Sequence, residues 1–301
     1  MGKHVSLILI ICTMLILGVS ASSAAHQVAV VKSADIGPYN EAVEGFKKNC
    51  SCSIRELSLS ESGDVPLRQQ IREQQPELIM TIGVDALTEV SRITDLPVVY
   101  AMVPNSQLPG MKARNVSGVN LYVAPEKYLN AILDLFPKTK RIGIVFDPKN
   151  LDAFVKEAEQ VAQKKGVELV LRKVTRANDV PAAIDMIHNR VDVFWMLPDV
   201  TVVNSESFKY LLGVSYQHNV PVFTFTKKYV EMGAAAGLYV VPADIGAQAA
   251  EIAKRILTDN TLKSPLRVDA RGAALIVNDR IIRKLGAAGN EDAVRRAGHV
   301  Q

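Results

Sequence analysis

The residues best suited to recognise a ligand stand where buried apolar runs of this chain end. The run FWMLPDVTVVN, residues 194–204, is bulky and apolar until it reaches Pro198 and Asp199. We expect Asp199 to emerge at the end of a buried strand, where its carboxylate can pair with an ammonium group or with other donors. The alternative is that Asp199 caps the turn before Thr201 by bonding its own backbone.

Other predicted strand ends carry residues of the same kind. Ligands of open parallel sheets bind outside the carboxyl ends of the strands, because the loops diverge there and helix N-termini present unpaired N–H groups. The candidate ligand-binding residues are therefore Ser33, Asp35, Tyr39, Gly83, Asp85, Met102, Asp147, Asp199 and Thr224.

Several of these residues also have a purely structural interpretation. Gly83 fits a tight strand-to-helix turn, and Asp85 fits the capping position of the following helix. Tyr39 can cover the helix that it starts, and Asp147 can form a turn. Trp195, in the middle of a strand, fits a core position better than an aromatic clamp on a ligand.

Motifs of common catalytic and cofactor sites are absent from the sequence. It contains no GxGxxG, GxxxxGK[ST], GxSxG or HExxH pattern, and no cysteine or histidine of the mature chain stands at a predicted strand end. We therefore expect no enzymatic activity, no cofactor and no metal site.

Short apolar runs alternate with amphipathic stretches along the whole chain. This alternation is typical of β-α units that build a parallel sheet, and runs that are apolar on both faces indicate strands covered by helices on both sides. The predicted strands are residues 27–33, 53–60, 77–83, 97–103, 141–147, 167–174, 191–197 and 221–226.

The order of these units repeats. Four β-α units span residues 27 to about 113, an irregular segment covers 115–125, and four more units run from 126 to about 232. The simplest organisation is two similar α/β lobes in tandem, each with a doubly wound parallel sheet. The C-terminal remainder is too short for a third lobe and should complete the first two.

The N-terminus has the pattern of a secretory signal. Lys3 precedes an apolar run from Val5 to Val19 and the small-residue stretch SASSAA, so we expect cleavage after residue 25. The apolar run is short for a retained membrane anchor, which needs about 20 residues. The bulky residues before Cys12 argue against a lipoprotein. The mature chain is therefore predicted to be soluble and exported.

Composition and the two mature cysteines add little about partners. The net charge of +4, with both signs interspersed along the chain, does not indicate a nucleic-acid-binding protein. Cys50 and Cys52 form a small disulfide or remain two thiols after a helix, and both interpretations stay open.

The motifs taken together resemble a known family. They are SADIGPYNEAVEGFKK, PELIMTIGVDAL, LPVVYAMVPN, NVSGVNLYVAPEKYLNAILDLFPKTKRIGIVFDPKN, VDVFWMLPDVTVVN and VPVFTFTKKYVEMGAAAGLYVVPADIGAQAAEIAKRIL. In this order they resemble the solute-binding proteins of ABC importers, in the branch related to tryptophan- and tyrosine-binding components. The likeness covers nearly all of the mature chain.

The resemblance implies the type I periplasmic binding fold, in which two α/β lobes are joined by a hinge. It implies lobe 1 at residues 26–124 plus about 238–262, lobe 2 at 125–237 plus about 263–290, and a tail at 291–301. It also implies a periplasmic monomer that passes a small-molecule ligand, such as an amino acid, to an ABC permease in the inner membrane and its ATPase.

The resemblance also assigns roles to residues. Asp199 occupies a polar position that faces the cleft, and Thr224 a strand-end position that often carries a hydroxyl. Val84 replaces a threonine suited to a ligand carboxylate. For a zwitterionic ligand, the expectation is that Asp199 takes the ammonium and that N–H groups near Gly83 take the carboxylate.

Hinge closure over a single ligand is the predicted mechanism. Two alternatives remain open on the sequence. The chain can serve as a ligand-binding module that feeds a membrane sensor, or as an exported α/β enzyme. A repressor with this fold would need a helix-turn-helix before the first lobe, where the signal stands instead.

Overall fold

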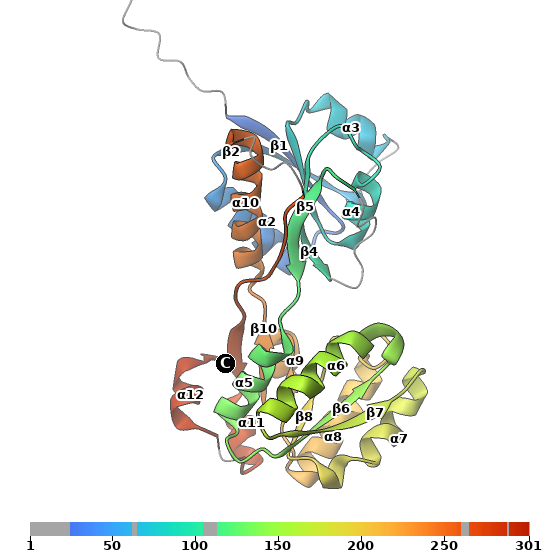
Figure 1. Cartoon of the computed structure of the whole chain (residues 1–301), viewed down its shortest axis with the longest axis vertical. Coiled ribbons are helices and arrows are strands. Elements are labelled where there is room, and N and C mark those ends of the chain that lie inside the picture. Colours follow the sequence, from blue (N-terminus) through green and yellow to red (C-terminus); the bar gives the residue numbers. More distant parts are fainter. Residues whose placement is uncertain (1–24, 62–64, 105–112, 260–264, 288, 301) are drawn as a thin grey trace, which may run out of the picture.

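The computed structural model describes residues 25–61, 65–104, 113–259, 265–287 and 289–300. The predicted signal peptide, except for its last residue, lies outside this part of the chain. Two α/β lobes lie one above the other and are joined by three crossing segments (Figure 1). No helix in the described ranges has the length and apolar character needed to cross a bilayer.

Lobe 1 is a six-stranded parallel sheet with helices on both faces. The strand order is β11-β5-β4-β3-β1-β2, and helices α2 and α10 cover one face while α3 and α4 cover the other. The bounds are β1 His26–Lys32, α2 Gly37–Asn49, β2 Cys52–Ser58, α3 Leu67–Glu73, β3 Leu78–Ile82, α4 Val84–Val90, β4 Val98–Pro104, β5 Val116–Leu121, α10 Pro242–Asp259 and β11 Arg267–Asp269.

Lobe 2 is a seven-stranded sheet in the order β13-β12-β10-β9-β8-β6-β7. Its pairings are parallel except that of β10 with β12. The bounds are α5 Pro125–Leu135, β6 Arg141–Phe146, α6 Pro148–Lys164, β7 Glu168–Lys173, α7 Val180–Asp185, β8 Val193–Trp195, α8 Ser205–His218, β9 Val222–Thr224, α9 Lys227–Glu231, β10 Ala236–Tyr239, β12 Ala274–Val277, α11 Asp279–Lys284, α12 Glu291–Arg296 and β13 Gly298–His299.

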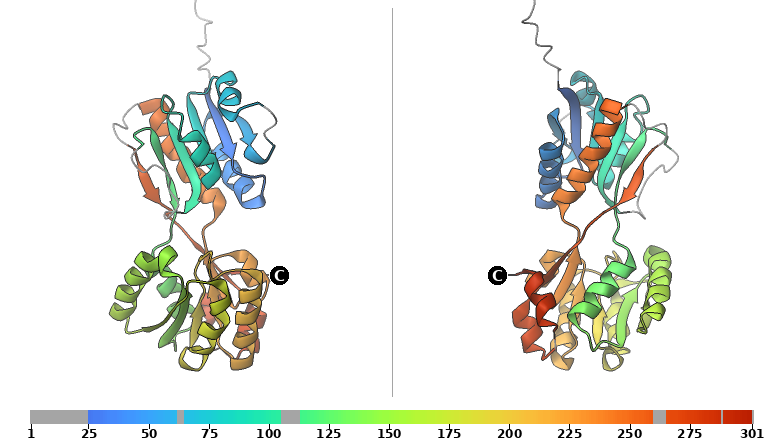
Figure 2. Two further views of the ribbon diagram at one scale, coloured as in Figure 1. Left: turned by 90° about the vertical axis from the view of Figure 1, so that its right-hand side faces the viewer. Right: turned by 60° about the vertical axis from the view of Figure 1, so that its left-hand side comes forward.

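The carboxyl ends of both sheets point toward the crossing segments. Strand β5 ends at Leu121, and the chain then passes directly into α5 of lobe 2. Strand β10 ends at Tyr239, and the chain then passes into α10 of lobe 1. Because β4 runs parallel to β5 and β9 runs parallel to β10, the carboxyl edge of each sheet faces the other lobe (Figures 1 and 2).

Burial explains why these segments adopt these elements. All five residues of β3 are buried, as expected for a central strand covered on both faces. Helices α2 and α10 can approach closely because Gly45 and Gly246 have no side chains. A Cβ on Gly45 would collide with the backbone of Ala243, and a Cβ on Gly246 would collide with the backbone of Ala42. The predicted fold class, two parallel-sheet α/β lobes, is confirmed.

The structure corrects two details of the predicted organisation. The segment expected to be irregular contains the strand β5, whose small residues Ser117 and Gly118 weaken the apolar pattern. The chain stays in lobe 1 through β11, which pairs with β5, whereas residues from about 263 were assigned to lobe 2. The chain enters lobe 1 after β10, which ends at Tyr239, next to the expected crossing at about residue 238.

Residues 291–301 are not a free tail where the structure describes them. Helix α12 packs on α5, and the Asn290 N–H donates to the Leu135 carbonyl at 2.9 Å. Strand β13 then pairs with β12 at the edge of the sheet. This segment therefore completes lobe 2, because its Ala293 and Ala297 side chains are part of the buried core.

Cys50 and Cys52 form a disulfide with a Cα–Cα distance of 5.3 Å. The bond joins the end of α2 to the start of β2. Of the two interpretations left open by the sequence, the structure has the disulfide.

Candidate functional site

Three of the predicted site residues lie together at the carboxyl edge of lobe 1. Gly83 follows β3 with a φ of 90°, a conformation that side-chain-bearing residues rarely adopt. A Cβ at this position would lie 2.5 Å from Ser33 Oγ and 2.7 Å from the Tyr39 hydroxyl oxygen. The missing side chain therefore lets the hydroxyl groups of Ser33 and Tyr39 approach the backbone of Gly83 closely, and we refer to this polar cluster of three residues as the lobe 1 notch.

The start of α4 closes one side of the lobe 1 notch. The Ser33 hydroxyl accepts the Ala86 N–H at 3.0 Å, so a side chain just after β1 caps this helix. The Gly83 N–H donates to the Ala101 carbonyl at 3.0 Å. Two of the N–H groups expected to receive a ligand carboxylate are therefore already engaged.

Asp85 stands in the first turn of α4 and is exposed. Burial raises the pKa of the Tyr39 hydroxyl, and the negative charge of Asp85 raises this pKa further. Asp85 is therefore close enough to the lobe 1 notch to act on Tyr39 electrostatically.

Asp35 is engaged by neighbouring side chains. Its carboxylate accepts Asn40 Nδ2 at 2.7 Å and the largely buried Lys32 Nζ at 3.3 Å, which together lower the Asp35 pKa. Lys32 also pairs with Glu56 on β2 at 3.2 Å. In this structure Asp35 therefore orders the end of β1.

Met102 marks an irregularity at the end of β4. Its φ is 58°, and the pairing of β4 with β5 shifts register between Tyr100 and Val103. A positive φ in a residue other than glycine costs about 1–3 kcal/mol and recurs at functional sites. The bend places Met102 at the carboxyl edge, half-buried against the core beneath α2 and α10.

Asp199 is turned into lobe 2 and bonded to protein donors. Only 1% of the residue is exposed. One carboxylate oxygen accepts the Asp147 N–H at 2.7 Å, and the other accepts Asn150 Nδ2 at 2.7 Å and the Thr201 N–H at 2.9 Å. This geometry is the turn-capping alternative of the sequence interpretation, so in this conformation Asp199 has no free oxygen facing the other lobe.

Asp147 belongs to the same network. Its side chain caps α6 by accepting the Lys149 N–H at 2.9 Å, and it accepts the Thr201 hydroxyl at 2.8 Å. Asn150 and Thr201, which sequence reasoning did not select, tie the ends of β6 and β8 together through Asp147 and Asp199. The spacing of aspartate two residues before threonine in PDVT was the available signal.

Thr224 and Trp195 are core residues. Thr224 has no exposed surface, and within the described part of the chain neither its hydroxyl nor the Trp195 indole N–H has a hydrogen-bond partner. The Trp195 ring packs with Tyr128 and Phe154, at centroid distances of 5.3 and 5.8 Å. The prediction that Trp195 is a core residue is confirmed, and Thr224 does not reach the open edge in this conformation.

Apolar side chains are exposed at both carboxyl edges. Ile36, just after β1 in lobe 1, is 45% exposed, and Val200, just after β8 in lobe 2, is 76% exposed. Exposed large apolar residues beside polar groups are common in ligand-binding surfaces. Neither residue was selected from the sequence.

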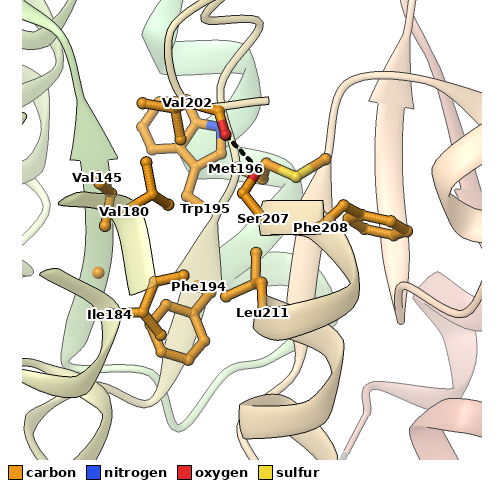
Figure 3. Close-up of a pocket in the computed structure, with 11 residues that line it drawn as sticks. Val145, Val180, Ile184, Phe194, Trp195, Met196, Val202, Ser207, Phe208 and Leu211 are labelled. Atoms are coloured by element: carbon orange, nitrogen blue, oxygen red, sulfur yellow. Dashed lines mark hydrogen bonds between the residues drawn. The ribbon is translucent and has the colours of Figure 1, made fainter. Parts of the chain in front are cut away.

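A cavity inside lobe 2 is too small to hold a solute. It lies between the sheet and helices α7 and α8, has a volume of about 30 Å³ and is lined almost entirely by apolar atoms (Figure 3). Because its lining side chains are mostly buried members of the lobe 2 core, we interpret it as a packing void.

The crossing segments are held by contacts from both lobes. Asn120 at the end of β5 accepts the Tyr100 hydroxyl at 2.6 Å and donates to Asp269 at 2.8 Å, which links two of the three segments. Arg271 in the third segment pairs with Glu251 of α10, and its carbonyl accepts Lys127 Nζ of α5 at 2.8 Å. These bonds hold the ends of the crossing segments against α5 of lobe 2 and against the strands and α10 of lobe 1.

Comparison with known proteins gives the family. Residues 54–301 match the model of the family described as ABC transporter substrate binding protein. The chain belongs to this family. It is a family of substrate-binding proteins rather than of enzymes, and the region matched includes every crossing segment, the whole lobe 2 sheet and the lobe 1 sheet apart from β1 and the first residues of β2.

A curated relative of this ABC transporter substrate binding protein is the tyrosine-binding protein of Clostridioides difficile strain R20291. The two are 23% identical over 198 residues, which cover 65% of this chain and 56% of the relative. The match thus spans little more than half the length of the relative.

Solved structures share the fold. A ligand-free, open substrate binding protein with adhesive properties from Clostridium difficile has a TM-score of 0.76 at 20% identity, covering 92% of this chain and 99% of that one. An ABC domain in complex with L-Trp from Streptococcus pneumonia has a TM-score of 0.63 at 19% identity, covering 92% and 100%. These likenesses confirm the type I periplasmic binding fold.

Proposed function

We propose that the protein captures a small solute between its two lobes and delivers it to an ABC permease in the inner membrane, where an ATPase drives import. The observation that carries this proposal is the arrangement of two parallel sheets whose carboxyl edges face each other across three crossing segments. Such edges are where open α/β sheets bind ligands.

The proposed cycle is a hinge motion. A ligand that contacts both edges gains its full set of contacts only when the lobes approach, so its binding shifts the population toward a closed form. The permease would recognise that form. The protein acts as a monomer without catalysis, and residues 1–25 direct its export to the periplasm before they are removed.

An amino acid or a related small molecule is the proposed ligand class. The relative named for tyrosine binding and the neighbour solved with L-Trp support this class. The ligand-contacting surface comprises the lobe 1 notch with Asp85, Asp35, Met102 and Ile36, and the lobe 2 edge at Val200. Asp147, Asp199 and Thr224 support the lobe 2 edge from within.

Native mass spectrometry of the purified protein, followed by thermal-shift screening of amino acids, amines, organic acids, nucleosides and sugars, tests the proposal. A bound solute at one copy per chain, or a compound that raises the melting temperature, is the expected result. Turnover of a bound compound into product, or failure of every class to bind, contradicts it. Uptake of the identified compound is then compared between cells with and without the protein. Import predicts that uptake falls when the protein is missing, whereas a sensing role predicts unchanged uptake.

A further inference from the structure

The two carboxyl edges differ in the charges that they present. In lobe 2, both acids expected to face the ligand are buried, Asp147 at 5% and Asp199 at 1% exposure. Their carboxylates accept hydrogen bonds from backbone N–H groups and from Asn150 and Thr201. Lobe 2 therefore offers no free carboxylate from these two residues to pair with a ligand ammonium.

Lobe 1 has the opposite character. The Gly83 N–H is bonded to Ala101 and the Ala86 N–H is bonded to Ser33, so these two N–H groups are not available to a ligand anion. The exposed Asp85 carboxylate adds a negative charge beside the same notch. A ligand carboxylate placed here would be repelled by Asp85, whereas a cation would be attracted.

Tyr39 supplies the second polar contact. Its hydroxyl lies at the lobe 1 notch, within reach of the space that a Cβ on Gly83 would fill. Burial and the charge of Asp85 both raise its pKa, so the hydroxyl stays neutral at physiological pH and its oxygen can accept a hydrogen bond from an ammonium group. Tyr39 and Asp85 therefore form an acceptor pair on one lobe.

We propose that Asp85 and the Tyr39 hydroxyl bind the positively charged group of the ligand, so that the protein selects small solutes with an ammonium or guanidinium group. This inference rests on the proposed function and reverses the polarity expected from the sequence, in which Asp199 of lobe 2 takes the ammonium. The exposed Ile36 beside Tyr39 contacts the apolar body of the ligand, and Val200 approaches it when the lobes close.

Matched ligand pairs test the polarity. Tyramine and 4-hydroxyphenylpropionate, or tryptamine and indole-3-propionate, share an apolar body but carry opposite charges. Calorimetric titration of the intact mature protein with each compound, and with L-tyrosine, L-tryptophan, L-arginine and putrescine, measures their dissociation constants. We expect binding among the compounds with a cationic group and none by the two acids.

Substitutions of Asp85 and Tyr39 test whether these residues bind the cationic group of the ligand. Asp85→Asn is expected to weaken binding of the cationic compound by at least about tenfold, the effect of losing one charge-assisted hydrogen bond. Glu89→Gln is the matched control, because Glu89 is an exposed acid on the same helix, one turn further from the notch. Tyr39→Phe should weaken binding by a smaller factor.

The outcomes separate this inference from the proposed function. An unchanged affinity in Asp85→Asn overturns the assignment. Tight binding of the acids, or of a sugar or nucleoside without a cationic group, overturns the polarity but leaves the solute-binding function intact. Absence of binding by every class of solute in the broader screen contradicts both.

Discussion

Asp199 at the end of β8 accepts the backbone N–H of Asp147 at the end of β6, with an N···O distance of 2.7 Å. The bond joins the two strand ends of lobe 2 that were expected to present separate ligand-binding carboxylates. Because Asn150 and Thr201 complete the network, both acids stabilise the edge of the sheet. The two acids therefore support the lobe 2 edge from within, whereas Asp85 in the first turn of α4 is an exposed acid beside the lobe 1 notch.

Replacement of Asp199 separates its structural role from a ligand-binding role. Asp199→Ala leaves the Asp147 N–H, the Asn150 amide and the Thr201 N–H without their acceptor. Each unsatisfied buried group costs about 1–3 kcal/mol, so the free energy of unfolding should fall by roughly 3 kcal/mol. Urea unfolding without ligand measures this loss.

Asp152→Asn provides the control for Asp199→Ala. Asp152 is a partly exposed residue of α6 that pairs with exposed Lys156, so its loss should change stability by less than about 0.5 kcal/mol. A normal unfolding curve for Asp199→Ala, combined with loss of ligand affinity, would restore the sequence-based role of Asp199.

A side chain at residue 83 should disturb the lobe 1 notch. Gly83→Ala combines a φ of 90° with a Cβ placed 2.5 Å from Ser33 Oγ and 2.7 Å from the Tyr39 hydroxyl oxygen. We expect a stability loss of about 1–3 kcal/mol together with weaker ligand binding. Gly213→Ala, in an open position of α8, should instead stabilise the protein by about 0.5–1 kcal/mol. Equal effects of the two variants in thermal unfolding would contradict the close packing of Ser33 and Tyr39 around Gly83.

The Asn120 amide is predicted to stabilise the first crossing segment. Asn120→Ala removes the acceptor of the buried Tyr100 hydroxyl and a donor to Asp269, so unfolding should become easier by about 1–3 kcal/mol. The exposed Asn49, which bonds only the Gly45 carbonyl among the described residues, is the control. Asn49→Ala should have less than half the effect, and an equal effect in chemical denaturation would count against the hinge role of Asn120.

Alkaline pH should destabilise the protein through Tyr100. Burial raises the pKa of its hydroxyl from 10.0 to about 12. The neutral form is therefore favoured in the folded state, and the stabilisation is complete below pH 10 and is lost as the pH rises from 10 to 12. Unfolding experiments across this window should show a steeper decline for the wild type than for Tyr100→Phe. Parallel declines would remove Tyr100 as a cause.

Much of the fold can be predicted from the sequence because buried apolar residues recur with the period of the helix or strand that carries them. Strands such as β3 and β6 are apolar on both faces, and the amphipathic period of α6 matches its buried side. Strand β5 escaped prediction because Ser117 and Gly118 interrupt its apolar pattern. The three-residue strand β11 is too short to carry any period at all.

The candidate site was harder to predict because periodicity places a residue at a strand end without orienting its side chain. Asp199 and Asp85 are both acids just beyond buried strands. The former turns inward because three donors surround it, while the latter remains exposed. Those donors come from segments about 50 residues away in sequence or from the following turn, so contacts of the folded chain decide which acid faces a ligand.

Small-angle X-ray scattering tests the central claim, that two lobes close over one small solute. The mature protein is measured alone and with a saturating amount of the compound that gives the largest thermal shift. We predict a smaller radius of gyration with ligand, at a stoichiometry of one per chain, because the lobes approach as the carboxyl edges engage the solute. Identical scattering profiles at confirmed saturation would contradict the account.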